Sequence, residues 1–357
     1  MSTLDLPSML EMDPETITLS DIDISHIDLW KQDKKWGFFK RLRDEAPVHY
    51  CKSSEYGPFW SITRFEDILE VERNWEIFSS YPRISIADPV EDSNFSAPTF
   101  IAMDPPKHDE QRKTVQGVVA PPNLKELEGT IRSRAGDILD DLPLNKTFDW
   151  VDRVSIELTT QMLATLFDFP YHDRRKLTRW SDVVFARLGE GIIESNEQRQ
   201  NELLECLDYF SKLWKEREKD PTGNDFVSMM IRGDATRNLS PQEYLGNILL
   251  LIVGGNDTTR NSISGGVLAL NQHPKEYQKL RENPALIPNM VSEIIRWVTP
   301  LAHMRRTVTK DFEFRGQPMK AGQKVIMWYA SGNRDERVIS HPEEFKIDRD
   351  RARNHIS

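Results

Sequence analysis

Residues 254–259, Gly-Gly-Asn-Asp-Thr-Thr, are the part of the sequence best equipped for chemistry. Asp257 and Thr258 place a carboxylate next to a hydroxyl, a pair that can order water molecules and pass protons along them. Gly254 and Gly255 leave the adjacent backbone open to a flat or bulky ligand, or to close packing by a neighbouring helix. The run is apolar up to Val253 and turns polar at Asn256, and this abrupt change favours the ligand over the helix packing.

A long helix over residues 240–272 must position this segment. Ser240-Pro241-Gln242-Glu243 combines a side-chain cap, a preset φ angle and a reciprocal capping bond at the helix start. His273-Pro274 predicts that the helix ends at residue 272. The helix is apolar nearly all round over its first turns, which predicts a buried central helix. Gly254-Gly255 costs about 1 kcal/mol per glycine relative to alanine and predicts a weak or kinked point.

Shorter elements surround this helix. Residues 48–65 predict a strand hairpin, and residues 66–226 are mostly helical in pattern, with a helix near 151–169 that places Val154, Leu158, Met162 and Leu166 on one face. Residues 288–297 predict a short helix, and 303–331 predict strands with turns at 315–316 and 321–322. The fold class is therefore mainly α with small β-sheets. Residues 1–35 are predicted to be an N-terminal arm and residues 36–357 a single domain.

Composition limits the partners of the chain. The 357 residues carry 47 basic and 57 acidic side chains, a formal net charge of −10, which disfavours nucleic acid and anionic lipid as ligands. The longest apolar run, 248–253, is far shorter than the roughly 20 residues of a membrane span, and no signal peptide pattern is present at the N-terminus. We therefore expect a cytoplasmic protein. Cys51 and Cys206 form no metal-binding or disulfide pattern.

Five motifs in order resemble those of the cytochrome P450 heme-thiolate monooxygenases. GGNDTT at 254–259 matches the [A/G]-G-x-[D/E]-T segment of their long distal helix, and EIIR at 293–296 matches their ExxR motif. HDEQR at 108–112 resembles the His-x-x-x-Arg of their early heme-propionate helix. Arg306 resembles their second propionate arginine, and PEEFKIDR at 342–349 resembles the segment that completes the ExxR network. The resemblance covers residues 36–357 and implies the P450 fold.

The resemblance implies heme b (iron protoporphyrin IX) as the cofactor. The two propionates of heme are anionic, and each charge-assisted hydrogen bond to them contributes roughly 1.5–3 kcal/mol. The candidate heme-binding residues are His108, Arg112, Gly254, Gly255, Arg306 and His355. For each of the cations, a solvated surface position is the alternative. The resemblance also assigns Thr258 to stabilising the oxygen being activated and Asp257 to the proton relay.

Two further groups of residues are expected to shape the site. Glu293, Arg296 and Arg349 are predicted to form a buried ion network with a structural role, so that loss of one partner prevents heme incorporation. The apolar candidates for contact with the substrate, each of which could instead be ordinary core, are Ile84, Ile86, Phe95, Phe100, Leu250, Val253, Leu301 and Ala302.

One departure from the family pattern is large. The P450 family holds its iron through the cysteine of an FGxGxHxCxG segment, and the chain stops at Ser357, where that segment should begin. Cys51 lies in the predicted hairpin and Cys206 in a charged amphipathic helix, so neither is a plausible replacement. We expect the chain to be C-terminally truncated, with the proximal cysteine beyond Ser357 and no metal ligand within it. Residues 1–357 alone are therefore expected to be inactive.

The amino-acid sequences around these motifs resemble those of the bacterial alkane and fatty-acid terminal (omega) hydroxylase branch. That branch inserts one oxygen atom of O₂ into an unactivated C–H bond of a small hydrophobic substrate, with electrons from a ferredoxin and its reductase. A catalytically inactive heme-binding or interaction fragment is the main alternative. A metal-dependent terpene synthase fits poorly, because Asp140-Asp141 is followed by Leu-Pro-Leu and the later Ser and Glu ligands after Asn256-Asp257 are absent.

Overall fold

The structure, a computed structural model, describes residues 9–88 and 97–356. The chain forms two compact units. Unit 1 comprises Met1–Val90 and Ala269–Ser357, and unit 2 comprises Glu91–Leu268. Among the described residues, no helix has both the length and the apolar character needed to cross a membrane.

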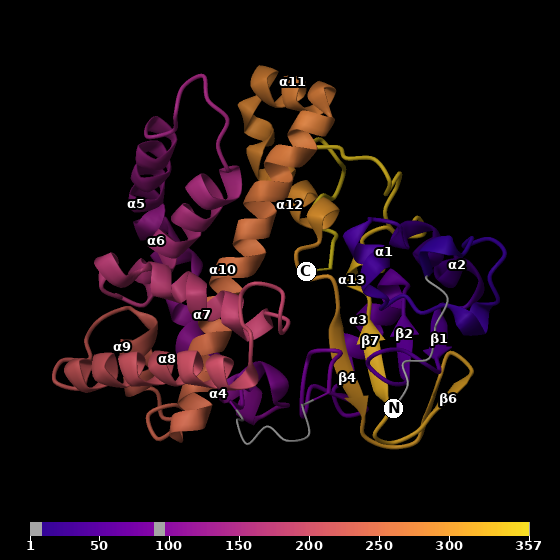
Figure 1. Cartoon of the computed structure of the whole chain (residues 1–357), viewed down its shortest axis with the longest axis horizontal. Helices are drawn as coiled ribbons and strands as arrows, with labels where there is room; N and C mark the ends of the chain where they lie inside the picture. Colours follow the sequence, from indigo (N-terminus) through magenta and orange to yellow (C-terminus); the bar gives the residue numbers. More distant parts are fainter. Residues whose placement is uncertain (1–8, 89–96, 357) are drawn as a thin grey trace. The chain divides into compact units, whose positions relative to one another are not determined.

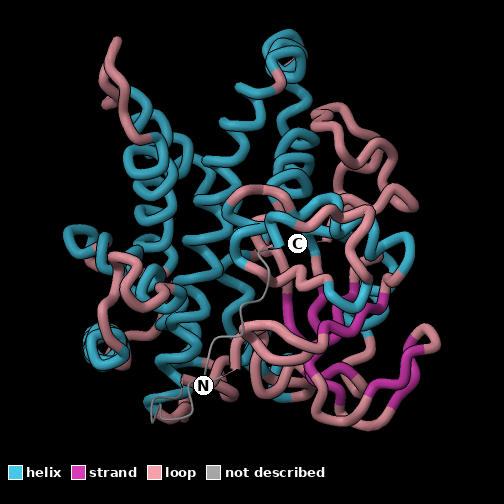
Figure 2. The backbone as a smooth tube through the Cα atoms, turned by 45° about the vertical axis from the view of Figure 1, so that its right-hand side comes forward, coloured by secondary structure: helices cyan, strands magenta, loops and turns pink. Residues whose placement is uncertain are grey.

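Unit 1 contains the two β-sheets formed by the described residues, together with several α-helices (Figures 1 and 2). Its α-helices are α1 Ile27–Lys31, α2 Lys35–Glu45, α3 Phe65–Arg73, α11 Pro274–Glu282, α12 Ile287–Val298 and α13 Tyr329–Gly332. Its strands are β1 Val48–Cys51, β2 Phe59–Ile62, β3 Phe78–Ser79, β4 Met304–Val308, β5 Phe312–Phe314, β6 Gln317–Met319 and β7 Lys324–Met327. Short 3₁₀ turns lie at Met9–Glu11, Leu19–Asp21 and Pro284–Leu286.

The larger sheet of unit 1 joins strands from both ends of the chain. Its order is β1-β2-β7-β4-β3, with β2 and β7 parallel and the other pairs antiparallel, while β5 and β6 form a separate hairpin. The predicted hairpin over 48–65 is confirmed, because β1 pairs with β2. In its turn Gly57 has φ +73°, a backbone conformation that favours glycine, and Ser54 Oγ donates to the Gly57 carbonyl at 2.8 Å. The predicted strand after 322 ends at Met327, because Tyr329–Gly332 is helical.

The described part of the predicted N-terminal arm packs onto unit 1. It contributes several side chains to an apolar cluster that contains Phe39, Ile326 and Trp328. The buried side chains from the arm are Met9, Ile17, Ile22, Ile24 and Leu29. These residues therefore belong to the core of the unit and do not extend away from it.

Unit 2 is helical. Its α-helices are α4 Lys107–Gln116, α5 Pro121–Asp140, α6 Glu157–Leu166, α7 Arg175–Phe185, α8 Asn196–Arg217, α9 Phe226–Arg232 and α10 Pro241–Gln272, whose last four residues belong to unit 1. A π-helical segment, Val151–Ile156, precedes α6, and 3₁₀ turns lie at Phe100–Ala102, Gly117–Val119 and Tyr171–Asp173. Figure 1 shows α7 and α8 crossing α10.

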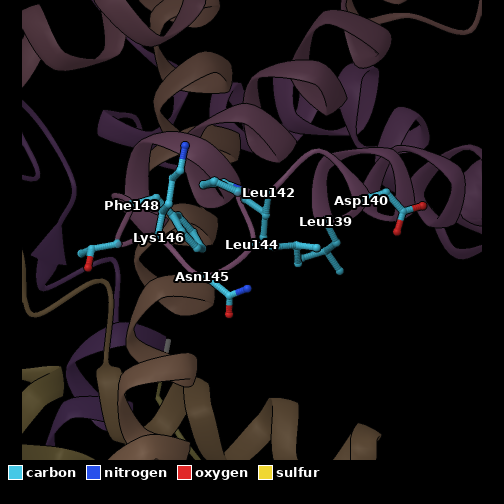
Figure 3. A pocket seen from close by; sticks show the side chains of 9 residues that line it. Leu139, Asp140, Leu142, Leu144, Asn145, Lys146 and Phe148 are labelled. Atoms are coloured by element: carbon cyan, nitrogen blue, oxygen red, sulfur yellow. The ribbon is translucent and has the colours of Figure 1, made fainter.

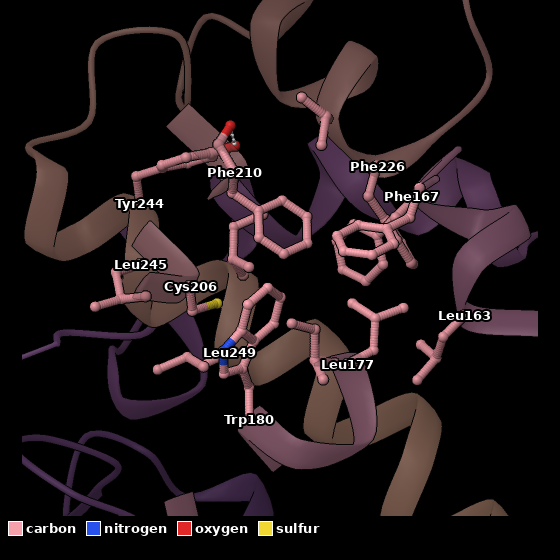
Figure 4. Close-up of a cluster of buried hydrophobic side chains, with 14 of the residues drawn as sticks. Leu163, Phe167, Leu177, Trp180, Cys206, Phe210, Phe226, Tyr244, Leu245 and Leu249 are labelled. Carbon is pink, nitrogen blue, oxygen red and sulfur yellow. Dashed lines mark hydrogen bonds between the residues drawn. The ribbon is translucent and has the colours of Figure 1, made fainter. Parts of the chain in front are cut away.

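The core of unit 2 lies among α6, α7, α8, α9 and α10 (Figure 4). Trp180 of α7 and Phe210 of α8 are each 1% exposed, and Phe167 contacts Phe210 edge to face with centroids 5.2 Å apart. Leu245 and Ile248 supply the face of α10. The prediction that the first turns of this helix are buried is confirmed.

The predicted bounds of α10 are also confirmed. Glu243 N donates to Ser240 Oγ at 3.3 Å, and Ser240 N donates to Glu243 Oε2 at 3.2 Å, which is the reciprocal capping bond expected from the sequence. The helix is uninterrupted for 32 residues, so the weak point predicted at Gly254-Gly255 does not break it.

The face predicted for the helix near 151–169 is only partly buried. Val154 is buried, Leu158, Met162 and Leu166 are half-buried, and Thr160 and Leu163 on other sides of the helix are buried. The reason is that α6 has close neighbours on other sides. Its Thr160 Oγ1 lies 2.6 Å from Thr178 Oγ1 of α7, and Leu163 packs at Gly255 of α10.

Candidate functional site

The two glycines of α10 differ in their surroundings. A methyl group at Gly255 would lie 2.6 Å from Leu163 Cδ2, so the missing side chain permits the close approach of α6. At Gly254 the same test meets no heavy atom within 4 Å. Gly255 thus fits the helix-packing alternative, and Gly254 leaves an open surface where a ligand could lie.

Arg260 of the same helix connects Asp257 to the neighbouring helix α7. Arg260 Nη2 donates to Asp257 Oδ1 at 2.6 Å, and Arg260 Nη1 donates to Asp182 Oδ1 of α7 at 3.1 Å. Burial alone would lower the pKa of the Arg260 guanidinium, but hydrogen bonds to Asp257 and Asp182 outweigh it and raise the pKa. The arrangement fixes one carboxylate oxygen of Asp257 and leaves the other without a bond among the described residues.

The hydroxyl of Thr258 is turned back along its own helix. Thr258 Oγ1 donates to the Gly254 carbonyl at 3.0 Å, one turn earlier. Because the hydroxyl proton is used in this bond, the oxygen keeps lone pairs that can accept a hydrogen bond from a water molecule or a ligand.

In unit 1, Glu293, Arg296 and Arg349 form a buried ion network. Arg296 donates to both carboxylate oxygens of Glu293 at 2.8 Å, and Arg349 Nε donates to Glu293 Oε2 at 2.8 Å. Burial alone would raise the pKa of Glu293, but the two arginines hold it below its ordinary value. Arg296 also donates to the carbonyls of Asn333 and Pro342, both at 2.9 Å. The network therefore ties α12 to the irregular segment that follows α13.

The predicted heme-binding residues lie in both units. In unit 1, Arg306 Nη2 lies 3.5 Å from Glu72 Oε1, and His355 Nδ1 is buried without a partner in the described part of the chain. Burial and the charge of Arg296 lower the pKa of His355, so its ring is neutral near pH 7.

In unit 2, His108 and Arg112 both lie on α4. His108 Nδ1 lies 2.7 Å from Asp109 Oδ1. Arg112 is exposed, and no acidic side chain of the described residues pairs with it. Binding of one heme by residues of both units stays a prediction.

The predicted substrate-contacting residues have mixed surroundings. In unit 2, Phe100 is 8% exposed within the core, its backbone N–H donating to Asn247 Oδ1, while Leu250 and Val253 are half-buried. In unit 1, Ile84, Leu301 and Ala302 are half-buried and Ile86 is 7% exposed. Phe95 lies outside the described residues.

A surface hollow of about 810 Å³ lies elsewhere in unit 2 (Figure 3). It is lined by Leu139 and Asp140 at the end of α5 and by residues 142–148 of the connection that follows, among them the exposed Leu144 and Lys146. None of the predicted site residues contributes to it, and its lining offers no arrangement of catalytic groups.

A model of the cytochrome P450 family matches residues 56–355, about five sixths of the chain. The chain belongs to the cytochrome P450 family. Its members bind heme b. Linalool 8-monooxygenase of Pseudomonas putida is 33% identical over 337 residues, which cover 92% of this chain and 83% of the relative. The methyl-branched lipid omega-hydroxylase of Mycobacterium tuberculosis strain H37Rv is 30% identical, covering 94% and 81%.

Solved structures show the same fold. A cytochrome P450-153 from Novosphingobium aromaticivorans superposes with a TM-score of 0.87 at 45% identity, covering 93% of this chain and 84% of that one. A related P450 from a Sphingomonas species gives a TM-score of 0.87 at 44% identity. These similarities confirm the P450 fold and fit the hydroxylase branch that the motifs indicated.

The residues of this P450 fit a heme. The buried, unpaired Nδ1 of His355 is an orphan group for which a propionate oxygen is a natural partner, and the open surface at Gly254 can accept a flat macrocycle. Neither cysteine fits the role of iron ligand, because both are buried. Burial raises the pKa of the Cys51 thiol to about 12 and also raises that of Cys206, which disfavours the thiolate.

Sequence reasoning missed two residues beside the predicted ones. Arg260 binds Asp257, and only its spacing of three residues on a helix could have indicated this pair. His303 precedes β4 and packs against Trp328 with ring centroids 5.0 Å apart. Burial lowers the pKa of His303 to about 4. The sequence gives no signal for this burial, because the contact joins residues from separate elements.

Proposed function

We propose that this P450 hydroxylates the terminal carbon of a medium-chain alkane or fatty acid, using O₂ and electrons from a ferredoxin and its reductase. The similarity to the P450-153 proteins supports this branch. The relative named as a lipid omega-hydroxylase supports an apolar chain attacked at its end. An alternative substrate of the linalool type is supported only by a similar level of identity.

The residues of α10 supply the proton handling in this proposal. Heme iron, when bound, supplies the activation of O₂ and the insertion of oxygen into the C–H bond. Thr258 Oγ, with its proton engaged by Gly254, accepts a hydrogen bond from a water beside it. Asp257 has a carboxylate oxygen outside its bond with Arg260 and passes a proton toward that water. The role of Arg260 is to fix the orientation of the carboxylate.

Leu250, Val253, Leu301 and Ala302 are proposed to contact the substrate. Leu250 and Val253 lie on the turn of α10 before Gly254, and Leu301 and Ala302 lie before β4. A chain end has no polar group to recognise, so terminal selectivity requires a narrow channel that admits the end first.

The iron ligand is proposed to lie beyond Ser357. Since both cysteines within 1–357 are buried and disfavour the thiolate, residues 1–357 alone are expected to show no turnover. The exposed Arg112 and Lys113 of α4 are proposed to contact the acidic ferredoxin, which predicts binding that weakens as ionic strength rises.

Product analysis tests the proposed function. The protein carrying the cysteine segment is supplied with a ferredoxin, its reductase, NADH and either dodecane or dodecanoate. The proposal predicts the terminal alcohol as the main product. Hydroxylation chiefly at internal carbons would contradict terminal selectivity, and the absence of any hydroxylated product from either chain would contradict the substrate class.

A further inference from the structure

The larger sheet of unit 1 gathers cations on one face. Thr307 of β4 lies directly opposite Lys324 of β7, and Arg305 is two residues before Thr307. Because successive side chains of a strand point to opposite faces, Arg305, Thr307 and Lys324 share the same face. Arg306, assigned above to the heme, lies on the other face. The cluster is therefore separate from the predicted propionate site.

The exposed carboxylate of Asp88 covers these cations. Asp88 Oδ1 accepts from Arg305 Nη1 at 2.7 Å, and Asp88 Oδ2 accepts from Lys324 Nζ at 2.8 Å. Lys324 also donates to the Tyr56 carbonyl. The side chains of Arg305 and Lys324 are 7% and 9% exposed, whereas that of Asp88 is 54% exposed. The carboxylate thus lies on the solvent side with both cations beneath it.

Within the described part of the chain, this cluster has more hydrogen-bond donors than acceptors. Arg305 Nε and Thr307 Oγ1 are buried and have no partner in the described part of the chain. Arg83, from the same segment as Asp88, is near enough for Arg305 to contribute, after burial, to lowering its pKa. Among the residues that the structure describes here, Arg83, Arg305 and Lys324 carry three positive charges, and Asp88 carries one negative charge. Unpaired buried donors are costly, so the cluster can stabilise a further acceptor.

Apolar groups adjoin the cluster. The backbone N–H of Arg305 donates to the carbonyl of Ile84 at 2.8 Å. Ile86, two residues further on, packs with Ile326 and Trp328 in the apolar core of unit 1. An anion with a hydrocarbon chain would therefore find cations and apolar side chains side by side. A free small anion would use only the cations.

We propose that this face binds the carboxylate of a fatty acid, which takes the place of Asp88 above Arg305, Thr307 and Lys324. The inference rests on the proposed function and narrows its substrate class from alkanes to fatty acids. Asp88 occupies the site when no fatty acid is bound and so prevents uncompensated positive charge.

Equilibrium dialysis of the heme-loaded protein with labelled dodecanoate and dodecan-1-ol tests the proposal without measuring turnover. Arg83→Gln should weaken dodecanoate binding about five-fold, and Asp88→Asn should strengthen it by a similar factor, because a partly exposed charge pair contributes on this scale. Neither variant should change the binding of the alcohol. Asp311→Asn is the matched control, because Asp311 pairs with the exposed Lys320 in the same unit. This control variant should leave the binding of both ligands unchanged.

The outcomes separate the two proposals. Equal effects of the variants on acid and alcohol would show that Asp88 only holds the loop, and would overturn the carboxylate site while leaving the hydroxylase proposal intact. Acetate competing with dodecanoate at equal concentration would show a simple anion site and overturn the fatty-acid assignment. Binding of the alcohol without binding of dodecanoate would overturn the carboxylate site and leave the hydroxylase proposal intact. Arg83→Gln breaks no bond among the described residues, so it remains informative if Asp88→Asn does not fold.

Discussion

The position of Thr258 makes it the residue whose loss should most directly damage catalysis. Its hydroxyl is held by the Gly254 carbonyl, which orients the oxygen for a water molecule. Thr258→Ala should leave substrate binding unchanged and lower the product formed per NADH consumed on the order of ten-fold, because general acid–base groups contribute at least this much. In the protein carrying the cysteine segment, oxygen and NADH consumption compared with product yield measures the coupling.

The neighbouring Thr259 provides the control for that experiment. It is exposed on the same helix, so Thr259→Ala should keep coupling near that of the unmodified protein. Coupling that is equally high in both variants would contradict the role given to Thr258.

His303 should make the stability of the protein sensitive to mild acid. Burial lowers its pKa to about 4, below the value near 6.5 of an unfolded histidine. The unfolded state therefore binds the proton first, and the contribution of the neutral ring, complete above pH 6.5, is lost as the pH falls from 6.5 toward 4. At pH 5 the loss should be about 1–2 kcal/mol.

His303→Phe should keep the aromatic contact with Trp328 and remove this loss. Urea unfolding at pH 7.5 and pH 5 should show a smaller fall in the free energy of unfolding for the variant. The exposed His172 supplies the control His172→Phe, which should retain the fall seen in the unmodified protein. An unchanged pH dependence in His303→Phe would show that other groups cause the acid sensitivity.

At the scale of the elements, the two glycines of α10 should respond oppositely to alanine. The methyl group added by Gly254→Ala meets no atom, so the higher helix propensity of alanine should raise the free energy of unfolding by roughly 0.5–1 kcal/mol. The same methyl group would reduce the space for a ligand at this surface. Gly255→Ala crowds Leu163 and should lower stability by about 1 kcal/mol or more. Chemical denaturation of both variants measures the difference, and a stabilising Gly255→Ala would contradict the close contact with α6.

The network around Glu293 should be the most sensitive link between elements in unit 1. Glu293→Gln leaves Arg296 and Arg349 buried without a counter-charge, and the free energy of unfolding should fall by about 3–5 kcal/mol. Heme content after purification should fall with it. Asp348→Asn breaks the exposed pair with Lys279 and should cost at most about 1 kcal/mol. Equal stability of the two variants would contradict a buried network.

Elements with strong local signals were predictable from the sequence, and contacts between distant segments were not. The capping residues and the terminal His-Pro bounded α10, and turn residues bounded the hairpin of β1 and β2. The predicted face of the helix near 151–169 was incomplete, because contacts with α7 and α10 bury other side chains of α6 as well. Arg260 and Asp88 escaped notice for the same reason, since their partners depend on the fold.

At the scale of the whole molecule, the family and its cofactor followed from the order of five motifs, and the family match extends over residues 56–355. Residues predicted to hold one heme come from both units, with His108 and Arg112 in unit 2 and Arg306 and His355 in unit 1. Heme binding is therefore the property on which the account of the site depends.

The most direct measurement is the absorption spectrum of the protein carrying the cysteine segment, expressed with abundant hemin, reduced and exposed to carbon monoxide. The account predicts a coloured protein whose main band moves to the long wavelength typical of thiolate ligation. A protein that purifies colourless, although folded by circular dichroism, would contradict it.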